Sequence, residues 1–243
     1  MPLANTEHTT KAFDVDLQDL KRMVAEMGGQ VERQLHSAID ALVHHDCAKG
    51  QKVVLADNAL DVLQQEIEAK AIATIATRQP MAVDLREVVG VLRIANDLER
   101  IGDLAKNIAR RVAGLNNGDL PRRASQGLTH MMGLAIGLLV RALDSFACAD
   151  STKAAAVRSR DEEIDLMYTS LFRELLTYMM EDSGTVTAGV HLLFCAKNIE
   201  RVGDHATNIA ESVYYMVEGH NFADERKKAD TTSTLRATAY PSH

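Results

Sequence analysis

Tryptophan is absent from this 243-residue chain, and proline occurs only four times. So few prolines among many Ala, Leu, Met, Glu and Lys residues favour long helices over a turn-rich β architecture. Hydrophobic residues make up 46% and charged residues 25% of the chain. That balance is typical of a globular protein with a core and argues against a disordered chain. The sequence therefore predicts an all-α fold.

Cysteine is also scarce, and Cys47, Cys148 and Cys195 lie far apart without Cys-x-x-Cys spacing. An odd number at such spacings indicates neither a disulfide framework nor a cysteine metal site. We interpret all three as reduced, small apolar fillers.

Long apolar runs are missing as well. No stretch of about 18 uninterrupted apolar residues occurs, which is the length that a membrane-spanning helix needs. Residues 1–11 lack the basic start and apolar core of a secretory signal. We therefore expect a cytoplasmic protein.

The formal net charge of −7 argues against binding to nucleic acid through phosphate neutralisation. One local basic cluster stands out, formed by Arg110, Arg111, Arg122 and Arg123. We interpret it as solvated helix ends that complement the helix dipole. A phosphate, lipid or docking patch is the alternative.

One segment occurs twice in the chain. Residues 97–109 read DLERIGDLAKNIA, and residues 198–210 read NIERVGDHATNIA. Each copy keeps a glutamate, an aspartate and an asparagine at steps of four. A repeat spaced by about half the chain predicts two copies of one structural unit.

Apolar residues at steps of three and four predict six long amphipathic helices. These helices cover residues 13–46, 50–77, 82–113, 122–149, 151–181 and 185–219. Turn-forming residues at 114–121 divide them into two sets of three. We expect two tandem, pseudo-symmetric antiparallel three-helix bundles at residues 12–114 and 121–219. The polar segment 220–243 is expected to be a disordered tail.

The repeated acids are the candidate functional residues. Helix geometry places Glu99 and Asp103 opposite the apolar seam of their helix, and hence outside the core. Glu200 and Asp204 take the same positions in the second copy. Two acids one turn apart repel each other unless a cation lies between them.

A second acidic pair on the neighbouring helix of each half strengthens this pattern. The four residues are Asp57 with Asp61, and Asp161 with Asp165. Oxygen ligands suit hard or intermediate ions, so we predict a divalent or ferric metal at each site, as one ion or a small cluster. Iron is the first choice, and Mn, Mg, Ca and Zn are alternatives. An ordinary solvated acidic face is the other interpretation.

Other residues of the repeated segment have simpler interpretations. We expect Gly102 and Gly203 to permit close helix packing, with room for a ligand as the alternative. Arg100 and Arg201 are expected to form surface ion pairs, and His205 is expected to be solvated.

Enzyme signatures are absent from the sequence. It contains no Gly-rich phosphate loop, no Gly-x-Ser-x-Gly elbow, no His-Glu-x-x-His zinc pattern and no Glu-x-x-His di-iron pattern. We therefore predict a protein without catalytic activity. A metal-storage or metal-dependent hydrolytic bundle that uses the same carboxylates is the alternative.

Three motifs in order resemble the PhoU family over residues 12–220. They are RQPMAVDLR at 78–86, DLERIGD at 97–103 and NIERVGDHA at 198–206. The resemblance implies paired three-helix bundles, each with a surface metal site built on Glu99 and Asp103 or on Glu200 and Asp204. The acids at 57, 61, 161 and 165 fit the family's acidic pattern too. The second half lacks the RQPMA signature at 181–187, so partner contacts through that loop are expected to be one-sided.

The resemblance also implies a function. PhoU proteins act as negative regulators of the phosphate-starvation response and of phosphate uptake. They couple the ATPase of the phosphate ABC transporter to a phosphate-sensing histidine kinase. By this likeness we expect a non-enzymatic, metal-binding adaptor that forms a homodimer and reaches the membrane only through its partners.

Overall fold

The computed structural model describes residues 4–115, 121–224, 229, 230 and 232. Within these residues all regular structure is helical, which confirms the predicted all-α class. The helices are α1 (Ala4–Val43), α2 (Cys47–Arg78), α3 (Val83–Arg111), α4 (Arg122–Cys148), α5 (Ser151–Arg158), α6 (Asp161–Glu181) and α7 (Val186–Glu218). Two short 3-10 helices are also present, at Val112–Gly114 directly after α3 and at Ser183–Thr185 directly before α7.

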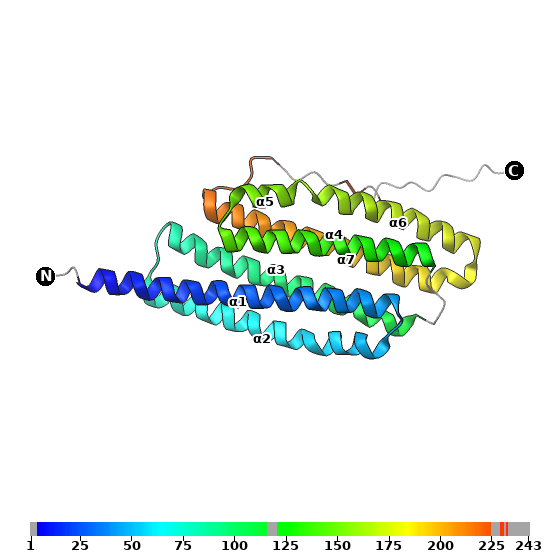
Figure 1. Ribbon diagram of the computed structural model, residues 1–243, viewed down its shortest axis with the longest axis horizontal. Coiled ribbons are helices and arrows are strands. Elements are labelled where there is room, and N and C mark those ends of the chain that lie inside the picture. Colours follow the sequence, from blue (N-terminus) through cyan, green and yellow to red (C-terminus); the bar gives the residue numbers. More distant parts are fainter. Residues whose placement is uncertain (1–3, 116–120, 225–228, 231, 233–243) are drawn as a thin grey trace.

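The long helices run along one axis and form two antiparallel bundles side by side (Figure 1). Helices α1 to α3 make the first half, and α4 to α7 make the second. The halves meet where α3 packs on α7 and α1 packs on α4. The predicted pair of three-helix bundles is confirmed, and the pairing places α3 and α7, which carry the repeated acids, in the middle of the molecule.

The apolar seams of α3 and α7 form part of one continuous core. Leu98 and Ile101 are fully buried on α3, and Ile199 and Val202 are fully buried on α7. Cys195 lies in this core, and burial raises the pKa of its thiol to about 12. Cys47 and Cys148 are exposed at helix ends, so the interpretation as apolar fillers holds only for Cys195.

The turns from α1 to α2 and from α4 to α5 are built alike. The residue just before each cap has a left-handed backbone, with φ of 53° at His45 and 49° at Ala149. Asp46 then caps α2 by accepting from the backbone N–H of Lys49 at 2.9 Å. Asp150 caps α5 in the same way, and its capping bond is 3.0 Å long. An aspartate that satisfies a free N–H explains why both helices begin where they do.

The middle helix of the second half differs from the expectation of one helix over 151–181. It is interrupted at Ser159 and Arg160, between α5 and α6. The Ser159 hydroxyl donates to the carbonyl of Ala156 at 3.0 Å, and the Arg160 N–H bonds to the carbonyl of Val157 at 3.0 Å. Such local bonds compete with the regular helical pattern, and the apolar periodicity runs through the break without showing it.

Among the described residues, α4 is the single helix that is long and apolar enough to cross a membrane. Half of the most apolar 18-residue stretch of α4 is buried inside the protein. The helix packs against α7, α6, α5 and α1. A core helix of a helical bundle passes the same test of length and composition, so this is weak evidence for a membrane span.

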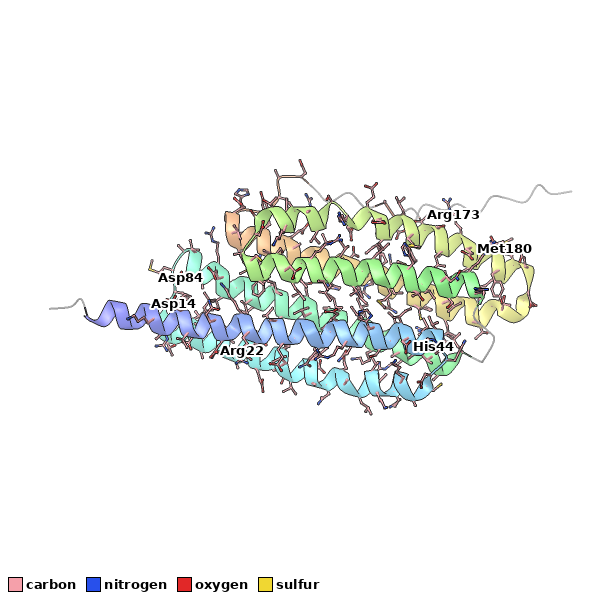
Figure 2. The ribbon with its side chains drawn as sticks, in the orientation of Figure 1. Asp14, Arg22, His44, Asp84, Arg173 and Met180 are labelled. Carbon is pink, nitrogen blue, oxygen red and sulfur yellow. The ribbon has the colours of Figure 1, made fainter. Side chains whose placement is uncertain are left out.

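The side chains at the two ends of the molecule can be followed in Figure 2. Met180 lies close to the α6–α7 turn. His44, the residue directly after α1, lies at the same end of the molecule. Asp84 lies at the opposite end, at the start of α3. These end regions frame the long central helices, on which the candidate site residues lie.

Candidate functional site

Glycine brings the two acidic helices of each half close together. A Cβ at Gly102 would lie 2.4 Å from Leu60 Cδ1 and 3.6 Å from Asp57 Oδ1. A Cβ at Gly203 would lie 2.9 Å from Ile164 Cδ1 and 3.4 Å from an oxygen of Asp161. The expectation of close packing at the two glycines is confirmed. It is this packing that sets a buried aspartate of the neighbouring helix beside each repeated motif.

In the first half the acids lie at the boundary between core and solvent. Asp57 is buried on α2, whereas Glu99, Asp103 and Asp61 are partly exposed. Burial raises the pKa of Glu99, and the negative charges of Asp103 and Asp61 raise it further against the opposing effect of Arg100. The acids are therefore close enough to repel one another.

An ammonium group of the chain itself lies among these acids. Lys106 Nζ donates to Asp57 Oδ2 and to Asp103 Oδ1. Burial would lower the pKa of Lys106, but the two carboxylates outweigh it and the pKa is raised. Sequence reasoning missed this residue, although its position three residues after Asp103 could have signalled an ion pair on one helix face. Arg100 pairs with Glu99 at 3.4 Å, as expected of a surface ion pair.

In the second half the acids are deeper. Glu200 is only 2% exposed, and Asp161 and Asp165 are likewise buried, whereas Asp204 is partly exposed. The expectation that the repeated acids lie outside the core is wrong for Glu200. The reason is that α7 packs against α3, α4, α5 and α6, so neighbouring helices cover more of it than its apolar seam.

The two oxygens of Glu200 have different surroundings. Oε1 accepts from Lys197 Nζ at 2.8 Å, whereas Oε2 is buried without a hydrogen-bond partner among the described residues. Burial raises the pKa of Glu200 against the effect of Lys197, and the charges of Asp204 and Asp165 raise it further. A buried carboxylate that keeps one oxygen unpaired beside other acids is a group that a cation would stabilise.

Lys106 itself is not repeated in the second copy of the motif. Thr207 stands at the position of Lys106, and its hydroxyl donates to Asp161 Oδ1 at 3.3 Å. A hydroxyl brings no positive charge, and the lysine of α7 that contacts the second group is Lys197, which pairs with Glu200 at 2.8 Å. The two acidic groups are therefore related by the repeat, but a lysine contacts them from different positions of it.

Part of the C-terminal segment lies over the second acidic group. The backbone N–H of Ala229 donates to Asp165 Oδ2 at 2.9 Å, and Asp230 pairs with Lys197 at 3.1 Å. Further back, Phe222 stacks on Tyr214 with ring centroids 3.8 Å apart. The remainder of the tail predicted to be disordered lies outside the described residues.

No three Asp, Glu, His or Cys side chains are arranged to surround one metal ion in the described part of the chain. The expected convergence of four carboxylates on one ion is therefore not formed by the side chains as they lie. The unpaired oxygen of Glu200 and the mutual repulsion of the acids still fit a cation in the second half. In the first half Lys106 supplies the positive charge.

The repeated segment also carries a contact between the halves. His205 on α7 is largely buried, and its ring Nδ1 lies 2.8 Å from Asp97 Oδ1 on α3. Asn208 Nδ2 donates to the same oxygen at 3.5 Å. The expectation of a solvated His205 is wrong, because the surface it would face is covered by the other half. The replacement of Asp97 by Asn198 in the second copy was the available sequence signal.

Comparison with known proteins agrees with this architecture. A PhoU domain model matches residues 24–112 and again residues 128–213. The chain belongs to the PhoU family. The two matches cover one half of the molecule each, so the internal repeat is a tandem pair of PhoU domains.

Relatives match over nearly the full chain. A protein of Rhizobium meliloti (strain 1021), named phosphate-specific transport system accessory protein PhoU homolog, is 54% identical across 94% of this chain and 96% of its own length. A protein of the same name from Caulobacter vibrioides (strain NA1000 / CB15N) is 46% identical across 94% of this chain and 99% of its own.

Solved PhoU structures share the fold. The crystal structure of PhoU from Pseudomonas aeruginosa has a TM-score of 0.82 and 36% identity, covering 86% of this chain and 100% of that one. The phosphate transport system regulatory protein PhoU from Streptococcus pneumoniae has a TM-score of 0.81 and 28% identity, covering 86% and 99%. These values agree with the paired bundles seen here.

Proposed function

We propose that this chain is a regulatory accessory protein of a phosphate-uptake system, which represses uptake and the phosphate-starvation response when phosphate is plentiful. The observation that carries the proposal is the match along nearly the whole chain, at 54% identity, to a phosphate-specific transport accessory protein. The regulatory name of the Streptococcus pneumoniae relative supports the same role. The chain acts by binding in the cytoplasm, without catalysis.

Deletion of the gene tests this role. We expect alkaline phosphatase activity to be high in phosphate-rich medium in the deletion strain and low again when the full chain is supplied in trans. Normal repression in a clean deletion would refute the proposal. Phosphate uptake measured in the same strains separates control of the transporter from control of gene expression.

The proposed partners are the ATPase of the phosphate ABC transporter and a phosphate-sensing histidine kinase, and the proposed assembly is a homodimer. The α2–α3 turn supports a docking role in the first half. Met81 is 80% exposed there, and Gln79 and Ala82 have positive φ values of 51°. Exposed apolar side chains on a strained turn are typical of a contact region.

Two exposed methionines provide a matched test of that surface. Met81→Ser should weaken copurification of the transporter ATPase, whereas Met180→Ser, at the other end of the molecule, should leave it unchanged. Met180 is 77% exposed, so both substitutions remove a similar exposed apolar side chain. Equal retention of the ATPase by both variants would exclude the α2–α3 turn. Sedimentation of the purified chain tests the homodimer.

We also propose that the repeated acids bind a divalent or ferric metal ion, with iron first and Mn, Mg, Ca and Zn as alternatives. In the second half Glu200, Asp204, Asp161 and Asp165 would hold it, and in the first half Glu99, Asp103, Asp57 and Asp61 would do so once Lys106 turns away. A bound ion supplies positive charge that offsets the repulsion among carboxylates. The unpaired Glu200 Oε2 supports the second site more strongly.

Elemental analysis of protein purified without a tag or chelator tests the metal proposal. Wild type should contain metal that is lost from the Asp103→Ala, Asp204→Ala double variant. Asp144→Ala is the control, because Asp144 is exposed on α4, a helix that carries none of the eight candidate acids. An empty wild-type protein would refute the metal and leave the adaptor role standing. Hydrolysis of phosphate esters by the same preparation would instead favour the enzymatic alternative.

A further inference from the structure

The end of α3 and the first turns of α7 line a cavity between the two halves that is open to solvent. Its volume is about 490 Å³. The side chains around it include Asn107, Arg110 and Arg111 from α3, and His191, Phe194 and Asn198 from α7. The lining combines guanidinium groups, amide groups, one imidazole and one phenyl ring, and it contains no carboxylate.

Arg111 is held across this cavity by contacts to the other half. Its guanidinium carbon lies 4.2 Å from the centroid of the Phe194 ring. Its Nη1 lies 3.3 Å from Nδ1 of His191. The simple interpretation of this arginine, a helix-end cation that complements the dipole of α3, does not explain why its contacts are to α7. An arginine fixed by stacking keeps its remaining N–H donors available for an anion.

The two basic pairs that the sequence groups together have different surroundings. Arg122 and Arg123 line a separate cavity together with Glu174 and Glu181. Arg110 and Arg111, by contrast, line a cavity without a carboxylate, and neither forms an ion pair in the part of the chain that the structure describes. The positive charge at the first cavity is therefore not neutralised by any described neighbour.

The internal repeat offers a direct comparison for this cavity. Asn198 and Asn107 line it, and the residues at their positions in the other copy are Asp97 and Asn208. There the chain supplies its own anion, because Asp97 accepts hydrogen bonds from Asn208 and His205. At the cavity an uncharged amide replaces that carboxylate.

A second replacement adds to the same difference. Arg110 at the cavity corresponds to Glu211 in the other copy, and Glu211 is already paired with Arg158 at 3.2 Å. One end of the α3–α7 contact thus has its own acids, whereas the other has two arginines and no acid among its lining residues. Among the described residues, the duplicated architecture therefore leaves a place for an external anion at this end of the contact.

We propose that this cavity binds a phosphate-type oxyanion, with Arg110 and Arg111 providing the charge. Asn107 provides amide N–H donors, and Asn198 provides its second N–H, because its Nδ2 also donates to the Phe194 carbonyl at 2.9 Å. The oxyanion is either free phosphate or a phosphate group carried on a nucleotide, since the recognising chemistry is the same. The site spans both halves, so its occupancy would strengthen the α3–α7 contact. It is separate from the acidic groups and requires no metal.

Calorimetric titration of the full-length chain tests the site, with inorganic phosphate in one arm and ADP in the other. The Arg110→Gln, Arg111→Gln double variant should weaken binding at least roughly tenfold, the effect expected from losing charge-assisted hydrogen bonds. The Arg122→Gln, Arg123→Gln double variant is the control. It removes the same amount of charge outside the cavity and should keep the wild-type affinity for the oxyanion. Circular dichroism establishes that each variant remains folded.

A third variant, Asn198→Asp, places in the cavity the carboxylate that Asp97 carries at the same position of the other copy. It should abolish binding, because it supplies an internal anion of nearly unchanged side-chain shape where the ligand would bind. Asn198→Ser should weaken binding less, since it removes the amide without adding charge.

The outcomes separate the sources of the oxyanion. Binding of inorganic phosphate with this pattern of variants assigns free phosphate, and binding of ADP alone with the same pattern assigns a carried phosphate. Absence of binding in both arms would overturn the proposal, and so would equal weakening by the two arginine pairs. Phosphatase repression in cells is measured independently, so the site can fail while the proposed regulatory function stands.

Discussion

His205 of α7 and Asp97 of α3 form a largely buried contact between the two halves, with 2.8 Å between Nδ1 and Oδ1. The two residues are 108 positions apart in sequence and belong to different copies of the repeat. Asn208 donates to the same carboxylate. The two PhoU domains are therefore joined by a polar contact in addition to their apolar seam.

Replacing Asp97 by alanine should lower the free energy of unfolding by about 2 kcal/mol, because two partly buried donors lose their acceptor. Chemical denaturation measures the change. Asp144→Ala is the control and should stay within about 0.5 kcal/mol of wild type, since Asp144 is an exposed surface residue of α4. Equal stability of the two variants would show that the contact contributes nothing to the association of the halves.

The glycines beside the acids should resist substitution for steric reasons. Gly102→Ala should destabilise the protein by about 1 to 3 kcal/mol, because its Cβ would lie 2.4 Å from the buried Leu60 side chain. Gly137→Ala on α4 is the matched control, since a Cβ there meets nothing within 4 Å. That control should be stabilised by about 0.5 to 1 kcal/mol through helix propensity alone. Thermal unfolding measures both changes. A lower melting temperature for Gly102→Ala together with a higher one for Gly137→Ala would establish close packing as the role of Gly102.

The helices were predictable from sequence because apolar residues at steps of three and four mark one buried face of each helix. The break at Ser159 was not, because Val157 and Ile164 continue that spacing across it. The burial of Glu200 was missed for a related reason. Spacing on one helix identifies the face with the most apolar residues, but α7 is covered by its neighbours on other sides as well.

The candidate site was only partly predictable. The repeat identified the acids on α3 and α7, and the glycines between them indicated a close neighbour. The lysines that contact the two groups, Lys106 in the first and Lys197 in the second, occupy different positions of the repeat, and the repeated acids do not reveal them. The contact of His205 with Asp97 joins different halves, and periodicity within one half carries no information about it.

Glu200 should make the stability of the metal-free protein depend on pH. Its pKa is raised above the ordinary value of 4.5, mainly by burial. The folded state therefore holds its proton more tightly than the unfolded state, and stability falls as pH rises from 4.5 through the folded-state pKa. Glu200→Gln removes this ionisation, so it should be more stable than wild type at pH 7, by about 1 kcal/mol if the unpaired oxygen is the main cost.

Urea denaturation between pH 4 and pH 8 measures this effect in chelator-treated protein. The advantage of Glu200→Gln should disappear towards pH 4, where the wild-type carboxyl is protonated in both states. Arg201→Gln is the control, because Arg201 neighbours Glu200 in sequence but is exposed. An advantage of Glu200→Gln that is constant with pH would contradict the assigned cause.

Lys106→Thr gives the first acidic group the residue that the second copy has at this position, Thr207. Asp57 is buried, and the variant removes the ammonium that it shares with Asp103. Breaking such a pair should destabilise the metal-free protein by about 3 kcal/mol. If the acids bind metal as proposed, Mn²⁺ should restore part of this loss, so its addition should raise the melting temperature of the variant more than that of wild type.

The control for this change is Lys52→Thr, which removes an exposed lysine from α2 without removing an ion pair of the described residues. It should alter neither the melting temperature of the metal-free protein nor its response to Mn²⁺. If Lys106→Thr were as stable as Lys52→Thr, the ammonium would not be the internal counter-charge of Asp57 and Asp103. If it were destabilised but unresponsive to Mn²⁺, the first acidic group would be a structural ion-pair site, and metal binding would have to reside in the second half, where Glu200 Oε2 is buried without a hydrogen-bond partner among the described residues.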